Sequence, residues 1–196
     1  MTSIRSDEAR ALLERSGMAA EAAHLIDEFD GVGEISFSPE SQSFPSDYSL
    51  DDAKCLIVSG DLIVTGMLET GDASVLIVTG KVTCESMFAR GAVVVQGAVE
   101  ANGFVWVSSG NDYSFLVDVV RSRVFVEHGT ASSATRFQTR VFRLMNDVFE
   151  TSTKRRFEKV SLADVEAFVR ADEGMSPANV QRLLKLVLSQ GVGADR

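Results

Sequence analysis

Two histidines are the residues of this sequence best suited to general acid-base chemistry. His24 lies in "AEAAHLIDEFD", and His128 follows Glu127 in "FVEHGT". Histidine is the side chain most often used as a general base near neutral pH. His128, with a carboxylate next to it in the sequence, is therefore the one candidate base. The alternative interpretation, which we favour, is that His128 is a polar residue in a surface turn.

Metal, thiol and phosphate chemistry have little support in the sequence. Cys55 and Cys84 lie within apolar runs, and two cysteines with two histidines supply neither a zinc-site spacing nor a disulfide framework. We expect small buried hydrophobic side chains at both cysteines. The "GVG" at 31–33 lacks the third glycine and the preceding strand of a dinucleotide-binding loop, and no serine nucleophile motif is present. The sequence thus predicts no catalytic residue, no metal and no cofactor.

The negative charge is concentrated near the N-terminus. Residues 1–53 contain 12 acids and 3 bases, residues 54–130 contain 8 and 5, and residues 131–196 contain 8 and 11. A protein that binds nucleic acid usually has a basic contact face, whereas "TKRRFEK" (153–159) is the only dense basic run here. We therefore expect no nucleic-acid partner. An acidic surface can instead speed association with a basic protein.

Two stretches are candidates for contact with a protein partner. The first is acidic and contains Asp27, Glu28, Asp30 and Glu34. The second is the polar run "SGNDYS" near the single tryptophan, where we single out Trp106, Asn111, Asp112 and Tyr113. A tryptophan beside polar loop residues anchors some interfaces. The alternative interpretation is that the acids only increase solubility and that the tryptophan fills the core.

These candidates must be positioned by a repeat in the middle of the chain. It consists of "LIVSGDLIVTG" (56–66), "LIVTGKVTC" (76–84) and "VVVQGAVEANG" (93–103). Aligning the copies makes Gly60, Gly80 and Gly97 equivalent, 20 and 17 residues apart. A fourth copy, "FLVDVVRSRVFV" (115–126), has Asp118 at that position. Such a short period is typical of proteins whose units bury their apolar faces by stacking.

The residue types within each copy indicate short strands. Runs of four or five β-branched and apolar residues end at a glycine or a polar residue. The spacers are too short for the helical crossovers of a βαβ sheet, and Asn102-Gly103 is the only two-residue hairpin signal. We predict a mainly β fold, a short parallel β-solenoid of about four rungs, with loops at 68–74 and 107–114. An antiparallel β-sandwich is the alternative.

Helical patterns flank the repeat on both sides. Residues 1–53 form an acidic segment with a helix capped by Ser6 and stopped by Gly17, a loop over 37–52, and between them an apolar stripe of Met18, Ala22, Leu25, Ile26 and Phe29. We expect this stripe to dock on the protein itself. The repeat itself covers residues 54–130.

Residues 131–196 are predicted to form a C-terminal helical segment. An apolar helical face is expected at Phe137, Val141, Met145 and Val148, although "RFQTRVF" alone is compatible with a strand. A capping box at Ser161 and Asp164 starts the next helix, and Ser176-Pro177 opens the last one. Because a short solenoid exposes strand edges at both ends, we expect the flanking segments to cover them and to favour a discrete particle over a filament.

The repeated pattern of residues 54–130, in which short apolar runs end at a glycine, resembles that of bactofilin-type, polymer-forming β-solenoid proteins of bacteria. That resemblance implies a cytoskeletal polymer without catalytic residues. The overall plan is similar to small bacterial proteins with a solenoid between helical pieces, some of which resemble immunity proteins encoded beside secreted toxins. Glycines at six-residue intervals are also similar to those of hexapeptide-type acyltransferases, whose base is a histidine between trimer subunits, and His128 is the residue that would take this role.

We expect a non-enzymatic protein-binding module, in the form of a bacterial immunity protein that masks a basic toxin through its acidic and solenoid surfaces. A bactofilin-like self-assembling scaffold and a hexapeptide-type acyltransferase are the alternatives. No apolar run approaches the roughly 20 residues of a membrane-spanning helix, and the N-terminus does not resemble a signal peptide. We therefore expect a cytoplasmic monomer or small homo-oligomer without a membrane partner.

Overall fold

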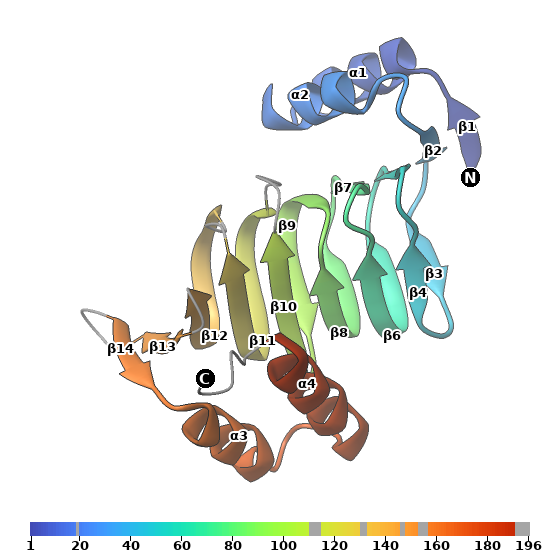
Figure 1. Cartoon of the computed structure of the whole chain (residues 1–196). Coiled ribbons are helices and arrows are strands. Elements are labelled where there is room, and N and C mark those ends of the chain that lie inside the picture. Colours follow the sequence, from blue (N-terminus) through green and yellow to red (C-terminus); the bar gives the residue numbers. More distant parts are fainter. Residues whose placement is uncertain (19, 110–114, 130–132, 146–147, 153–156, 191–196) are drawn as a thin grey trace.

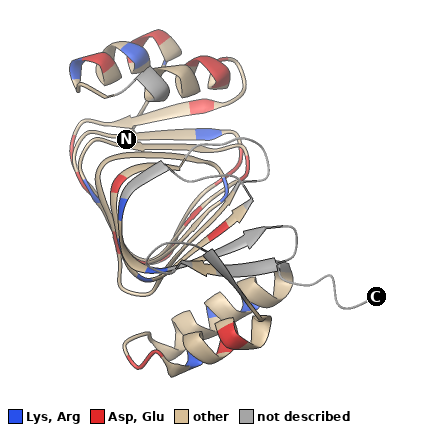
Figure 2. Cartoon of the chain, turned by 90° about the vertical axis from the view of Figure 1, so that its left-hand side faces the viewer, with Lys and Arg blue, Asp and Glu red and all other residues tan. Residues whose placement is uncertain are grey.

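The chain coils through about five turns of a parallel β-solenoid with three flat faces (Figures 1 and 2). The computed structural model describes residues 1–18, 20–109, 115–129, 133–145, 148–152 and 157–190. Successive turns pair in parallel, with a register of 20 residues between β5 and β7 and of 17 between β7 and β9. This parallel order excludes the β-sandwich alternative.

Each turn contributes one short run to each face. The strands of the coil are β2 (Glu34–Ser38), β3 (Gln42–Phe44), β4 (Tyr48–Leu50), β5 (Lys54–Val58), β6 (Leu62–Thr70), β7 (Val75–Val78), β8 (Val82–Ala89), β9 (Ala92–Ala101), β10 (Phe104–Ser109), β11 (Phe115–Gly129) and β12 (Ser133–Met145). We define face A as residues 34–38, 54–58, 75–78, 92–95, 115–117 and 133–134. Face B is residues 42–44, 62–64, 82–84, 98–101, 119–121 and 136–138. Face C is residues 48–50, 67–70, 86–89, 104–109, 124–129 and 140–145.

The N-terminal helices cover the outside of face A. α1 (Ser6–Arg15) and α2 (Ala20–Phe29) lie on this side of the coil, as the ribbon views show (Figures 1 and 2). Their buried residues Leu13, Ile26 and Phe29 share one cluster with the outward residues Ile57 and Ile77 of face A. The predicted docking of the apolar stripe is thus confirmed. The helix start is one residue earlier than predicted, because Arg5 rather than Ser6 occupies the cap.

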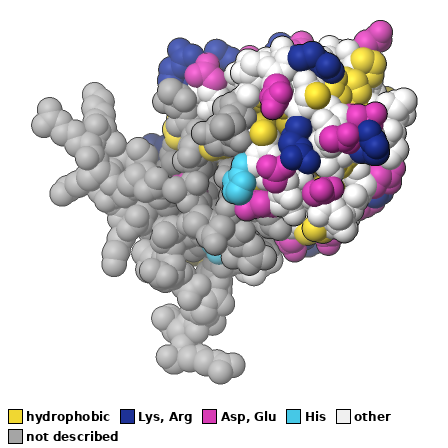
Figure 3. Space-filling model, turned by 90° about the horizontal axis from the view of Figure 1, so that it is seen from above, with side chains coloured by type: hydrophobic (Ala, Val, Ile, Leu, Met, Phe, Trp, Pro, Cys, Tyr) yellow, Lys and Arg dark blue, Asp and Glu magenta, His cyan; other side chains and the backbone are white. Residues whose placement is uncertain are grey.

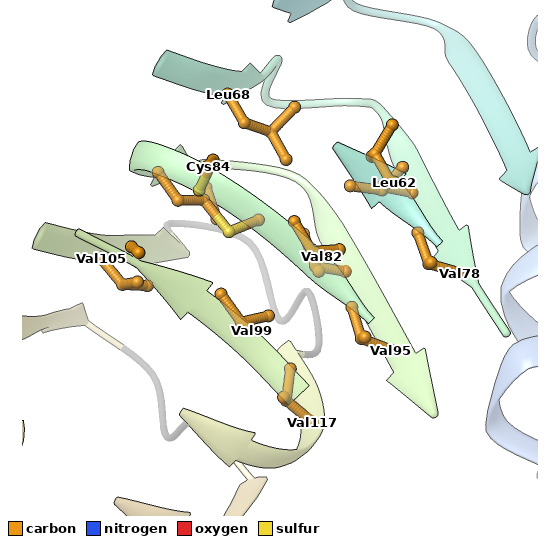
Figure 4. Packing of buried hydrophobic residues seen from close by; sticks show 14 of the residues in the cluster. Leu62, Leu68, Val78, Val82, Cys84, Val95, Val99, Val105 and Val117 are labelled. Carbon is orange, nitrogen blue, oxygen red and sulfur yellow. The ribbon is translucent and has the colours of Figure 1, made fainter. Parts of the chain in front are cut away.

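A hydrophobic core fills the inside of the coil. One inward column of face B consists of Leu62, Val82, Val99 and Val120, of which Figure 4 labels the first three. The stacked rings of Phe44 and Tyr48, 3.9 Å apart, lie at the N-terminal end of this core. At the other end, the ring of Phe137 packs 4.9 Å from that of Phe125. Aromatic side chains therefore close the core at both ends.

The chain after Gly129 differs from the prediction. Residues 133–145 form β12, which continues the coil parallel to β11, and β13 (Val148–Ser152) and β14 (Phe157–Val160) add antiparallel strands. The predicted helical face at Phe137, Val141, Met145 and Val148 is therefore wrong, and the strand alternative for "RFQTRVF" is confirmed. The physical reason is that polar and apolar residues alternate in this stretch, and the free edge of β11 supplies a partner for a strand.

Two other C-terminal predictions are confirmed, and the helices they start cover face C. α3 (Leu162–Ala171) begins after a capping box in which the Asp164 amide donates to Ser161 Oγ over 3.1 Å and the Ser161 amide donates to Asp164 Oδ2 over 3.0 Å. α4 (Pro177–Gln190) starts at its proline. A second cluster joins Val165 and Leu183 of these helices to Phe104 and Trp106 of face C.

The solenoid is longer than predicted on both sides. The predicted loop over 37–52 contains β3 and β4, which pair with β6 and complete the first turn. Their three-residue length and flanking prolines conceal them in the sequence, since the pairing with the next turn rather than local propensity forms them. The loop predicted at 68–74 is shorter, because β6 runs to Thr70. In the loop predicted at 107–114, residues 107–109 belong to β10, and the rest lie outside the described residues. Within the described residues, no helix has the length and apolarity needed to cross a membrane.

Candidate interaction surfaces

The acidic candidates lie at the surface around α2, with Asp27 and Glu28 on the helix and Asp30 and Glu34 within five residues of its end. Asp27, Glu28, Asp30 and Glu34 are all exposed. Three of them have partners: Arg10 Nη1 lies 3.0 Å from Asp27 Oδ1, His24 Nε2 lies 3.2 Å from Glu28 Oε1, and Ser6 Oγ donates to Asp30 Oδ1. Figure 3 shows basic side chains among the acidic ones on this side. The surface is therefore acidic but partly neutralised by its own bases.

Trp106 is not part of the surface. Its side chain is fully buried on the outer side of face C, beneath α3 and α4, and its ring is edge-on to Phe88 at 6.5 Å. An anchoring contact between Trp106 and a partner does not fit this position, and the core interpretation does. The core concerned is the one between face C and the helices, not the inside of the coil. The other three loop candidates, Asn111, Asp112 and Tyr113, lie outside the described residues.

His128 belongs to a strand rather than to a surface turn. Ser108 Oγ lies 3.2 Å from His128 Nδ1, and the His128 ring is edge-on to that of Trp106 at 6.4 Å. The pair joins neighbouring turns, since Ser108 on β10 is the register partner of His128 on β11. Among the described residues, no group of three or more His, Cys, Asp and Glu side chains is arranged to hold a metal ion.

Both cysteines are buried, as predicted. Cys55 faces α2 from face A, and Cys84 points into the core of the coil. Burial raises the pKa of each thiol to about 12, and the neighbouring Glu85 adds to the shift at Cys84. A thiol that stays protonated at neutral pH is a poor nucleophile and a poor metal ligand. These cysteines therefore act as packing residues.

Face B is the side of the coil on which neither helix pair packs (Figure 2). Its outward residues form a column with one member per turn: Ser43, Ile63, Thr83, Glu100, Arg121 and Gln138. Glu100 accepts from both neighbouring turns, with Lys81 Nζ at 3.2 Å and Arg121 Nη1 at 2.8 Å. Most outward residues of faces A and C are apolar and covered, whereas those of face B are mostly polar, and Arg121 donates to both Glu100 and Gln138. Face B is therefore a flat, solvated surface that the fold leaves free.

The corner between faces B and C is fixed to α4 by a buried polar network. The Asn179 side chain donates from Nδ2 to Glu85 Oε1 over 2.8 Å, and its Oδ1 accepts from Ser86 Oγ over 2.8 Å. A Cβ on Gly103 would lie 2.6 Å from both Asn179 Nδ2 and Ser86 Oγ, so only glycine leaves room for this network. On the same helix, Arg182 Nη2 donates to Asp47 Oδ2 over 2.7 Å. The helix is thereby held along the coil.

The two ends of the coil have different strand edges. At the N-terminal end, β1 (Thr2–Ile4) pairs antiparallel with β2 and covers the edge of face A. There β3 and β4 pair only with β6 among the described strands, and each is three residues long. Pro39 and Pro45, two of the three prolines in the chain, flank β3. Short strands and prolines are devices that protect an edge from unwanted pairing.

At the C-terminal end, β13 pairs with residues 142–145 of β12 and covers the edge of face C. Residues 133–140 of β12 pair with β11 on one side, and on the other side no strand of the described ranges lies against them. The flanking segments predicted to cover the ends thus do so only in part. Strands β1 and β13 cover edges, whereas the helices cover faces A and C, because the outward apolar residues are on those faces.

Sequence reasoning missed the surface at this end, which contains Arg136, Phe137 and Arg140. The signal that could have found it is the alternation in "TRFQTR" (135–140), which favours a strand with charged residues on one side.

No family model matches the chain, and no curated protein or solved structure matches it significantly. The solenoid is consequently established by its own strand order and register.

Proposed function

We propose that the protein is a discrete, non-enzymatic protein-binding module. The observation that carries this proposal is that end-to-end stacking of copies is blocked on two of the three faces. A continuous stack needs a free edge at both ends of each face, but β1 occupies face A at one end and β13 occupies face C at the other. Within the described residues, face B alone has no covering strand at either end. At its N-terminal end the edge strand is β3, which has only three residues available for pairing.

A solenoid that does not stack still provides a rigid, flat surface. Side chains one turn apart are held in register by the parallel ladders, so a partner meets a nearly fixed pattern of charges at little entropic cost. The polar column of face B and the acidic surface around α2 are the two surfaces that such a module offers. We propose that the acidic surface steers a basic protein toward the module, since complementary charge mainly increases the association rate.

An acidic surface on a rigid module is compatible with an immunity protein that masks a basic toxin in the bacterial cytoplasm. We select two of the exposed acids, Glu28 and Glu34, for testing. The experiment mixes the purified protein with the product of a neighbouring gene and measures the association rate at two salt concentrations. The proposal expects a complex of fixed stoichiometry, with association slowed at least tenfold by Glu28→Lys and Glu34→Lys together.

A matched control reverses Glu166 and Glu173 near the opposite helix pair and should leave the association rate unchanged. If both double variants slow association equally, net charge rather than the acidic surface around α2 determines the rate. If no neighbouring product binds and none is toxic, the immunity proposal fails.

A bactofilin-like scaffold is the second candidate. The features that favour this candidate are the parallel coil and its regularly spaced glycines, on which the resemblance to bactofilin-type proteins rests. Opposite charges also lie near the two ends of the coil, with Glu40 and Asp47 in the first turn and Arg136 and Arg140 in the last. Such charges would attract the first turn of one copy to the last turn of another. Because β1 and β13 cover edges of faces A and C, the two copies could pair strands only along face B. Growth of molar mass with concentration would favour this candidate.

A further inference from the structure

The free edge of β12 differs from the free edge at the opposite end of face B. β3 has three residues between two prolines, whereas residues 133–140 of β12 contain no proline and are in register with β11 along most of their length. An unprotected edge presents a row of backbone N–H and C=O groups that can pair with another strand. Within the ranges that the structure describes, prolines and short length protect one edge of face B, and no strand covers the other.

An aromatic ring is exposed at this edge. Phe137 is in register with the inward residue Val120, and its ring packs on Phe125, yet 38% of its surface remains accessible. The other exposed large hydrophobic side chains of the described residues, Met1, Val32, Ile63 and Leu188, are not aromatic. A strand added beside β12 would cover this ring by continuing the core of the coil by one rung.

The charges beside Phe137 indicate what kind of strand fits. Arg136, Gln138 and Arg140 are exposed, and Arg136 Nη2 donates to Asp118 Oδ2 over 2.8 Å. The Arg140 guanidinium lies over the rings of Phe142 and Phe168, at 5.9 and 5.3 Å from their centroids. Two copies of this edge would place arginines opposite each other, which is unfavourable. A strand with acidic residues would instead find complementary charge.

We propose that residues 136–140 of β12 accept an added β-strand from a partner protein, namely an extended segment in which acidic and apolar residues alternate. The acidic residues lie beside Arg136 and Arg140, the apolar residues cover Phe137, and main-chain hydrogen bonds supply affinity as in other cases of strand addition. This inference rests on the proposed function, because it names the partner chemistry that one end of the module recognises.

The test uses a labelled seven-residue peptide with alternating glutamate and valine, added to the full-length protein at low salt. A second peptide has lysine in place of glutamate, and a third is the acidic peptide with N-methyl groups on alternate residues. Fluorescence anisotropy should show that the acidic peptide binds at least tenfold more tightly than the lysine peptide. The N-methylated peptide should not bind, because it lacks the amide donors that a ladder needs.

Variants locate the site. Arg136→Gln with Arg140→Gln should abolish the preference for the acidic peptide, and Arg136→Glu with Arg140→Glu should reverse it. Lys81→Glu, which changes a charge on face B away from this edge, is the matched control and should leave the preference unchanged. Amide hydrogen exchange at residues 136–140 should slow when the acidic peptide binds.

Equal affinity for the acidic and lysine peptides would overturn the inference. So would a preference that persists in the glutamine variant, or binding without slower exchange at 136–140. These outcomes are distinguishable from failure of the proposed function, which is read from complex formation with a neighbouring gene product. A complex that forms normally with the glutamine variant would place the partner elsewhere on the module.

Discussion

The amide of Gly80 donates to the carbonyl oxygen of Gly60 over 2.8 Å, and a Cβ on Gly80 would lie 2.6 Å from that same oxygen. The next turn repeats the relationship, with the Gly97 amide 3.0 Å from the Gly80 oxygen. Glycine is needed at Gly80 and Gly97 because the backbone of the preceding turn lies too close for a Cβ. The corner ladder thus connects the repeat seen in the sequence to the coil.

Replacing the corner glycine Gly80 by alanine should destabilise the coil through a steric clash alone. Gly80 has no positive φ, so Gly80→Ala adds a backbone clash without backbone strain. We expect a loss of about 1–3 kcal/mol in the free energy of unfolding, as for other overpacked sites. Urea unfolding followed by circular dichroism measures this loss. Thr65→Ala, at an exposed position of the coil, should change stability by less than about 0.5 kcal/mol, and equal losses in both variants would contradict the ladder account.

Asn179 should matter much more than the exposed amide that binds the same carboxylate. Asn179→Ala leaves Glu85 and Ser86 without their buried partner, which should cost about 1–3 kcal/mol. Asn102 Nδ2 donates to the other oxygen of Glu85 over 3.1 Å but is exposed. Asn102→Ala should therefore have little effect. Limited proteolysis near α4 provides a local readout, and similar sensitivity of both variants would show that burial does not decide the effect.

The single tryptophan should tolerate loss of its N–H but not of its ring. Trp106 Nε1 is buried and has no hydrogen-bond partner among the described residues. Trp106→Phe keeps an aromatic ring and removes this unpaired donor, so we expect a cost well below the roughly 3–5 kcal/mol of a change to alanine. Thermal unfolding of the two variants tests the difference. A phenylalanine variant as unstable as the alanine one would indicate a hidden partner for the indole.

Both cysteine thiols should be inert in the folded protein and should make it less stable at alkaline pH. Their pKa rises from 9.0 to about 12 on burial, so the folded state holds protons that the unfolded state releases. The contribution of each protonated thiol to the free energy of unfolding is therefore fully present below pH 9. It is lost as the pH rises toward 12, at about 1.4 kcal/mol per pH unit for each cysteine. Thiol reagents at pH 8 should detect no thiol before denaturant is added and two afterwards.

A variant with Cys55→Ala and Cys84→Ala separates this effect from the titration of lysine and tyrosine. It should be less stable at neutral pH because two small cavities are created, but its stability should fall less steeply above pH 9. The same slope in both proteins would show that the cysteines do not cause the loss.

The repeat was readable from sequence because glycine spacing and strand composition are local signals. β3 and β4 were missed because three-residue strands between prolines have no such signal and form by pairing with β6. The helices were expected at the ends of the coil but lie on its faces. "CLIV" (55–58) and "VLIV" (75–78) are apolar at every position, and strands of this kind are buried on both sides, which is the signal that face A is covered.

The acidic candidates around α2 were found from composition, and their exposure agrees with a role at the surface. Their partial neutralisation by Arg10 and His24 was not predictable, since these contacts depend on how the two elements pack. Trp106 was singled out as a partner contact because the polar run "SSGNDYS" begins two residues after it, whereas its burial comes from α3 and α4, more than fifty residues away along the chain. Such contacts leave no trace in a local pattern.

The most direct test of the central claim is the molar mass of the purified protein, measured by light scattering over a hundredfold range of concentration. Because β1 and β13 block stacking on faces A and C, a constant mass and no fibres in electron micrographs are predicted. Deleting residues 1–5 uncovers the edge of face A and should allow some growth in mass. Growth of the intact protein into fibres would contradict the account and would make the coil an assembly unit.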